Sequence, residues 1–132
     1  MNIKIHNQVK AIASDIISMR RDFHKYPELG FNEFRSAEII AHKLESFGLE
    51  VKKCVGKTGV VGTLNPNHKG KTIALRADMD ALPIQENSSL EFTSVNDGIM
   101  HACGHDGHMA MLLGAAEILS NQARKSALQL ER

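Results

Sequence analysis

The spacing of apolar residues changes along this 132-residue chain, and that change limits the folds that it can adopt. In the first 25 residues, apolar side chains recur at steps of three and four, the period of an amphipathic helix. They are Val9, Ile12, Ile16, Met19 and Phe23. We therefore expect a helix over about residues 7–25, which ends near His24 or Lys25 because Pro27 cannot continue it.

The helical period returns once and then gives way to shorter patterns. It covers NEFRSAEIIAHKLESFGLE, in which Gly48 is positioned to end a second helix. Three strand-like runs follow, LEVKKCV, GVVGTLN and KTIALRAD, with turn sequences between them. Residues 84–100 are polar and weakly patterned, which indicates an irregular excursion with one short strand at most. Helical spacing resumes at Asp106 and continues to Leu119.

The expected order is helix, helix, strand, strand, strand, loop, helix, which is typical of an α/β layer architecture. The length corresponds to one ordinary domain, and 42% hydrophobic residues are enough for a packed core. A helix that begins near residue 106 should lead into another strand in such a fold. The polar tail over residues 121–132 supplies none.

The charge and cysteine content exclude several classes of protein. Sixteen basic and 15 acidic residues give a net charge of +1, which argues against partners such as nucleic acid or an anionic membrane. Two cysteines allow at most one disulfide, which favours a reducing compartment. The chain has no signal-peptide pattern at its start and no apolar run long enough to span a membrane. We therefore expect a cytoplasmic protein.

The densest group of chemically versatile side chains is HACGHDGH, residues 101–108. Cys103 and His105 are two positions apart, and a thiolate with an imidazole suits Zn²⁺ and related divalent ions. His108 follows three positions later, so it can face the same side of a helix that begins near Asp106. A single histidine or cysteine is usually structural, but four such residues in eight positions favour a metal or catalytic role.

Two ligands do not complete a zinc site, so further groups must come from elsewhere. RADMDALP, residues 76–83, offers Asp78 and Asp80 at the end of an apolar run. On an extended strand these two carboxylates point to the same face, where a cation would neutralise them. A turn that begins before Pro83 explains the same residues without any site, and the sequence leaves both interpretations open.

Three stretches, RRDFHKYPELGFNE, RADMDALP and MHACGHDGH, together resemble signatures of one family of metal-dependent amidohydrolases and peptidases. This family includes hippurate hydrolase, N-acyl-amino-acid amidohydrolases and auxin-conjugate hydrolases, and it is related to aminoacylase and to dinuclear zinc carboxypeptidases. The resemblance covers about residues 16–120. It implies the N-terminal part of a dinuclear zinc-peptidase-like catalytic domain, truncated, with helices flanking a mixed sheet over residues 1–120 and an unrelated tail over 121–132.

The resemblance also implies a reaction, the hydrolysis of the amide bond of hippurate-like N-acyl amino acids by a metal-activated water. It implies two divalent ions per full-length site (Zn, Mn or Co), a small-molecule substrate and, for full-length members, a homo-oligomer. Cys103 and His105 match metal ligands, and Asp80 matches an acidic catalytic residue that orients a ligand. Three further motif residues would support the ligands without binding the metal directly, or, for Asp106 and His108, cap the helix; they are Asp78, Asp106 and His108.

The family's catalytic base is a glutamate in a Glu-Glu pair on the strand after this last helix, and its further histidine ligands lie downstream. Here the acidic residues after the motif are Glu117 and Glu131, and neither belongs to such a pair. We therefore expect this chain alone to be inactive. Two alternatives remain open: a metal-binding module without a catalytic base, and an interaction protein that pairs with a full-length homologue through an exposed sheet edge.

Overall fold

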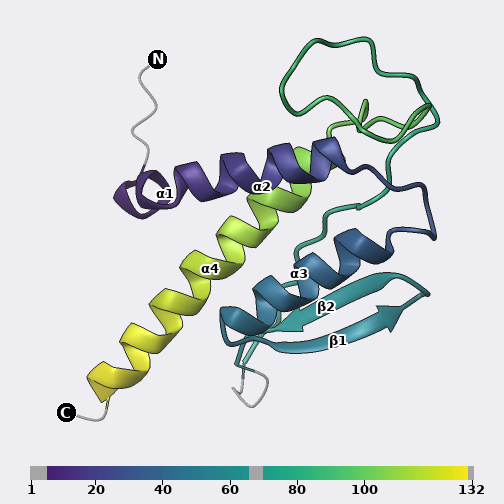
Figure 1. Ribbon diagram of the computed structural model, residues 1–132. Coiled ribbons are helices and arrows are strands. Elements are labelled where there is room, and N and C mark those ends of the chain that lie inside the picture. Colours follow the sequence, from purple (N-terminus) through teal and green to yellow (C-terminus); the bar gives the residue numbers. More distant parts are fainter. Residues whose placement is uncertain (1–5, 66–69, 131–132) are drawn as a thin grey trace.

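The computed structural model describes residues 6–65 and 70–130, which form four helices and one two-stranded sheet (Figure 1). The elements in chain order are α1 (Asn7–Ala11), α2 (Ala13–Lys25), α3 (Phe34–Ser46), β1 (Glu50–Val55), β2 (Gly59–Thr63) and α4 (His105–Leu130). Helices combined with a small sheet agree with the expected α/β class. None of the helices in the described ranges has the length and apolar character required to cross a membrane.

The single helix expected over residues 7–25 is interrupted at Ile12. The Ile12 N–H turns back to the carbonyl of Val9, three residues earlier, at 3.3 Å, and its backbone leaves the helical region at φ −108° and ψ 6°. This tighter turn separates α1 from α2. The predicted C-terminal end is confirmed, since α2 stops at Lys25, two residues before Pro27.

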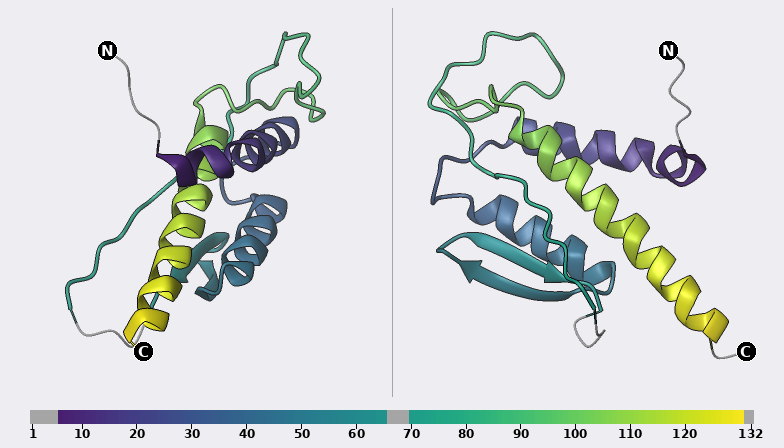
Figure 2. Two further views of the ribbon diagram at one scale, coloured as in Figure 1. Left: turned by 90° about the vertical axis from the view of Figure 1, so that its left-hand side faces the viewer. Right: turned by 180° about the vertical axis from the view of Figure 1, so that it is seen from behind.

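The helix α3 packs on the hairpin that β1 and β2 form (Figure 2). Gly48 ends α3 as predicted, with φ +81° and its N–H bonded to the carbonyl of Glu45. The two strands are antiparallel, and Val51 pairs with Gly62. A Cβ atom at Gly62 would lie 3.0 Å from a methyl group of Leu44, so the glycine allows α3 to lie close to the sheet.

The prediction of a third strand, over KTIALRAD, is wrong. Residues 71–80 have no strand neighbour within the described part of the chain, and Ile73 and Leu75 are 84% and 59% exposed. A strand exists only when a neighbour satisfies its backbone groups, and β1 and β2 pair only with each other here. The irregular excursion over residues 84–100 is confirmed, with no strand in it beyond an isolated bridge between Leu82 and Met100.

The core lies where α2, α3 and α4 meet. Its buried members are Phe23, Leu44, Met109 and Leu113. The helices α2 and α4 approach closely at Gly114, where a Cβ atom would lie 2.6 Å from Cδ1 of Ile16. The helix α4 begins at the expected position but runs on to Leu130 rather than ending near residue 120. Because α2 packs against α4, the packing of these two helices holds the first turn of α4, which carries the candidate metal ligands, in place.

Candidate metal centre

The chain enters α4 through a turn that depends on a glycine. Gly104 has φ +86°, a conformation that residues with a Cβ rarely adopt. Its N–H bonds to the carbonyl of His101 at 3.3 Å, and its own carbonyl accepts the N–H groups of Gly107 and His108. The turn therefore presents residues 103–105 at the N-terminal end of α4, where the helix dipole favours a bound anion such as a thiolate.

Asp80 and His105 are in direct contact. The Nδ1 atom of His105 lies 2.9 Å from the carbonyl oxygen of Asp80 and 3.1 Å from its carboxylate Oδ1. Both atoms are acceptors, so Nδ1 carries the hydrogen and Nε2 carries the lone pair in the neutral ring. A histidine that donates from one nitrogen to a carboxylate is held in the tautomer that binds a metal with the other nitrogen.

Cys103 lies at the same carbonyl group. Its Sγ atom is 3.7 Å from the carbonyl oxygen of Asp80, and its side chain is exposed. The structure therefore brings Cys103 and His105 together beside Asp80, at the tip of the unpaired segment over residues 71–80. These are the three residues that the sequence analysis selected, two as metal ligands and Asp80 as the acidic residue that orients a ligand.

Asp78 and His108 lie at the margin of this group. Asp78 accepts hydrogen bonds from the guanidinium of Arg76, at 2.9 Å from Nε and 2.8 Å from an amino group. Among the described residues, no hydrogen bond or ion pair joins Asp78 to Cys103 or His105. His108 is exposed, and its ring centroid is 5.8 Å from that of His105, so these histidines share one side of the first turn as expected.

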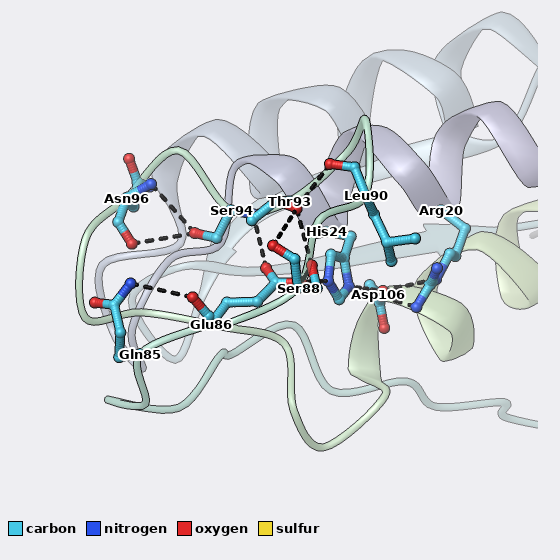
Figure 3. A network of polar contacts seen from close by, with 10 residues as sticks. All are labelled: Arg20, His24, Gln85, Glu86, Ser88, Leu90, Thr93, Ser94, Asn96 and Asp106. Carbon is cyan, nitrogen blue, oxygen red and sulfur yellow. Dashed lines mark hydrogen bonds and ion pairs between the residues drawn. The ribbon is translucent and has the colours of Figure 1, made fainter.

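Asp106 makes its contacts inside the protein, with side chains of α2 (Figure 3). Its side chain is fully buried and accepts from Nδ1 of His24 at 2.7 Å and from Nε of Arg20 at 2.8 Å. The other ring nitrogen of His24, Nε2, lies 3.1 Å from Oε1 of Glu86. A chain of polar contacts thus runs from α4 through α2 to the irregular segment over residues 84–100.

Glu86 organises that segment. Its carboxylate accepts from the hydroxyl of Ser88 at 2.6 Å and from the backbone N–H of Ser94 at 2.7 Å. Burial acts to raise the pKa of Glu86, but these bonds and the one from His24 outweigh it and lower the pKa, so the group is a carboxylate at neutral pH. The ring of Phe92 covers His24 edge-on, with 5.6 Å between centroids.

The sequence did not single out this buried network. Arg20 and His24 are four residues apart on α2, within a stretch that carried the family resemblance, so their position on one helix face could have been recognised. Glu86 lies in a polar segment without periodicity, and nothing in its neighbourhood marks it as buried. Sequence reasoning therefore identified the exposed side of the first turn of α4 and missed what holds its buried side.

His101 is the remaining histidine of the motif. It is buried, and neither ring nitrogen has a hydrogen-bond partner among the described residues. Burial lowers the pKa of His101, and the nearby charge of Asp106 opposes that effect only in part. His101 is therefore neutral at neutral pH.

The donor set fits part of a metal centre. Within the described ranges, no group of three or more histidine, cysteine, aspartate or glutamate side chains is arranged to hold an ion. Two donors are nevertheless oriented for one, the Cys103 sulfur and the Nε2 of His105, and a sulfur with an imidazole nitrogen suits zinc and its neighbours in the transition series. These residues offer half of a four-coordinate site.

Comparison with known proteins finds a family of peptidases and several hydrolases that resemble this chain. Residues 74–130 match the model of peptidase family M20/M25/M40. The chain is 51% identical over 117 residues to thermostable carboxypeptidase 1 of Saccharolobus solfataricus, covering 88% of this chain and 30% of that protein. It is 46% identical over 123 residues to hippurate hydrolase of Campylobacter jejuni, covering 93% and 32% of the two proteins.

A solved structure has a fold similar to that of this chain. The Bacillus subtilis YXEP protein, described as a dinuclear metal-binding peptidase of the M20 family, superposes with a TM-score of 0.80 at 45% identity, covering 86% of this chain and 32% of that one. The chain thus shares the fold of a class of metal-dependent hydrolases. Over residues 74–130 it is similar to peptidase family M20/M25/M40, and it spans about 30% of the length of the relatives that it matches.

Proposed function

We propose that the protein represented by this chain hydrolyses the amide bond of N-acyl amino acids with a metal-activated water. The name of the Campylobacter jejuni relative, hippurate hydrolase, supports this substrate class, because hippurate is an amino acid with an aromatic acyl group on its nitrogen. The match to a peptidase family supports a hydrolytic reaction, and the dinuclear metal binding ascribed to the YXEP protein supports one that depends on metal.

The observation that carries the proposal is the contact between Asp80 and His105. Asp80 accepts the Nδ1 hydrogen with two oxygens, which turns the Nε2 lone pair outward and raises its basicity. The Cys103 sulfur, on the same carbonyl oxygen, supplies the second donor. When bound, the metal would lower the pKa of water and polarise the scissile carbonyl. Asp80 then acts on the reaction through the ligand that it orients.

The other motif residues have supporting roles in this proposal. Asp106 holds the first turn of α4 from its buried side, and His108 and Asp78 border the exposed side. We propose two ions of Zn²⁺, Mn²⁺ or Co²⁺ per complete site, with the general base and further ligands supplied by residues outside this chain. We also propose a small-molecule substrate, a homo-oligomeric whole protein and, as a prediction from the sequence alone, a cytoplasmic location.

Cobalt binding tests the ligand assignment on the 132-residue chain. We expect titration with Co²⁺ to produce a thiolate-to-cobalt charge-transfer absorption. Cys103→Ala should abolish this absorption, and His105→Ala should weaken the affinity for Co²⁺ by about 10-fold or more. Cys54→Ala is the matched control, since Cys54 is also an exposed, free cysteine, and it should leave the absorption unchanged. An absorption that survives Cys103→Ala would contradict the proposed site.

Turnover tests the reaction. We expect the chain alone to bind metal without hydrolysing N-benzoyl or N-acetyl amino acids, and a longer form of the protein that contains a Glu-Glu pair to hydrolyse them in the presence of Zn²⁺, Mn²⁺ or Co²⁺. Loss of that turnover in Cys103→Ala would support the proposal. A longer form that binds metal but cleaves no amide would instead favour the non-catalytic metal-binding alternative.

A further inference from the structure

We propose that His24 is a positioning residue of the metal centre, acting through Asp106. This inference rests on the proposed function, because it assigns His24 a role toward ligands that are themselves proposed. His24 lies on α2, 4% exposed, and touches neither Cys103 nor His105 by any hydrogen bond in the described structure. Its influence on the site would therefore be indirect.

The physical link is one peptide unit long. His105 and Asp106 are consecutive in the first turn of α4, and their side chains contact different parts of the protein. His105 reaches outward to Asp80, whereas Asp106 reaches inward to His24. The first turn is thus held from both sides, by Asp80 on the exposed face and by His24 on the buried face. Release of either side would let the imidazole of His105 shift relative to the Cys103 sulfur.

Charge strengthens the contacts on the buried face of the first turn of α4. The two ring nitrogens of His24 each contact one buried carboxyl group, and Arg20 donates to the same oxygen of Asp106. Hydrogen bonds that involve an ionised donor or acceptor are the shorter and stronger ones. The 2.7 Å contact to Asp106 decides the direction at Nδ1, since the approach of an Arg20 amino group to that atom is longer, at 3.4 Å.

The second contact of His24 explains why a histidine is needed. Its Nε2 binds Glu86, which in turn accepts from Ser88 and Ser94 in the segment over residues 84–100 (Figure 3). Only a side chain with donors at both ends of a rigid ring can join Asp106 to Glu86 in this way. Glutamine can donate to one partner, and alanine to neither, so the two substitutions should differ in the size of their effect.

A purely structural role for His24 would lower the stability of the chain and leave the folded site unchanged. A positioning role changes the site in molecules that are still folded. Two readouts separate these cases: the affinity for Co²⁺ at a temperature where the variant is fully folded, and the tautomer of the His105 ring in the metal-free chain, which nitrogen chemical shifts in NMR spectra report.

The experiment compares His24→Gln with His42→Gln in the 132-residue chain. His42 is an exposed histidine on α3 and serves as the matched control. We expect His24→Gln to weaken Co²⁺ binding by about 10- to 100-fold, the usual cost of losing a group that supports a metal ligand. It should also reduce the fraction of His105 with hydrogen on Nδ1, and His24→Ala should do both more strongly. His42→Gln should change neither readout.

Unchanged Co²⁺ affinity and unchanged His105 tautomer in folded His24→Gln would overturn the inference. If that variant does not fold, Asp106→Asn replaces it, because the amide keeps the shape of Asp106 and an acceptor for His24 but loses the charge. The failure of the proposed function looks different: binding then survives Cys103→Ala or is absent from the unmodified chain, and the inference falls with it. If Cys103→Ala abolishes binding and the His24 and Asp106 variants bind normally, only the present inference fails.

Discussion

The first turn of α4 has two faces that differ in how far their polar groups are satisfied. On the exposed face, Cys103 has one long contact and the Nε2 atom of His105 has no hydrogen bond within the described structure. On the buried face, Asp106 binds the side chains of Arg20 and His24 at 2.8 Å or less. The same few residues of sequence therefore contain donors that are available to a ligand and a buried carboxylate whose Oδ2 atom is bound by two side chains, while its Oδ1 atom has no hydrogen-bond partner among the described residues.

This difference shows how a short motif can serve two purposes. Groups that bind a metal must have no hydrogen-bond partner in the protein, so they contribute little to the free energy of unfolding. Groups that hold the backbone in place must be buried and hydrogen-bonded, so they contribute more to that free energy but are not available to a ligand. Substitutions on the two faces should consequently differ in what they change, stability on one side and metal binding on the other.

The largest expected effect is that of Asp106→Ala. This change leaves Arg20 and His24 without the carboxylate that both contact, and the loss of one member of a buried ion pair costs about 3–5 kcal/mol of unfolding free energy. Cys103→Ala, on the exposed face, should stay within about 0.5 kcal/mol of the unmodified chain. Urea denaturation of the metal-free chains measures both. Equal losses in the two variants would refute the distinction between the faces.

A smaller effect is expected where α4 packs on α2. A side chain at Gly114 would collide with Ile16, so Gly114→Val should destabilise the chain by about 1–3 kcal/mol, the usual cost of an overpacked contact. Gly107→Ala is the control, since a Cβ atom there meets nothing within 4 Å. Alanine in a helix should make it slightly more stable than glycine. Thermal unfolding followed by circular dichroism compares the two, and a tolerated Gly114→Val would show that the helices separate easily.

The smallest effect concerns pH. The pKa of Glu86 is lower in the folded chain than its ordinary value of 4.5, because its hydrogen bonds with Ser88, Ser94 and His24 outweigh burial. The unfolded chain therefore binds the proton first as pH falls, and the stability from Glu86, complete above pH 4.5, is lost progressively below it. Glu86→Gln should flatten this acid limb in unfolding measurements between pH 6 and pH 3. An unchanged slope would show that Glu86 does not contribute.

Much of the fold could be predicted because the helices have strong local signals. The apolar periodicity, Pro27 and Gly48 identify the ends of α2 and α3, and β-branched residues mark β1 and β2. The run over residues 71–80 carries the same kind of signal, yet it forms no strand here. A strand depends on a neighbour elsewhere in the chain, and no local pattern reveals whether that neighbour is present.

Some residues of the candidate site could also be predicted from local sequence, whereas others could not. Cys103, His105 and Asp80 could be selected because ligand types at close spacing are rare in a sequence, and the structure brings these three together. The roles assigned to them, and the division of the chain at residue 120, stay predictions. Glu86 could not be found, because its burial results from tertiary contacts with His24 and Ser94, residues that its own neighbourhood in the sequence does not indicate.

The unpaired segment over residues 71–80 has a consequence for Asp80. That residue reaches His105 at the end of an arm whose Ile73 and Leu75 side chains face solvent, and the nearest backbone anchor beyond it is the bond from Ala81 to the carbonyl of Glu28. Any strand that docks along this arm would stiffen it and narrow the range of positions open to the Asp80 carboxylate. The orientation of the His105 ring would then depend on a strand that pairs with residues 71–80, well outside the HACGHDGH motif.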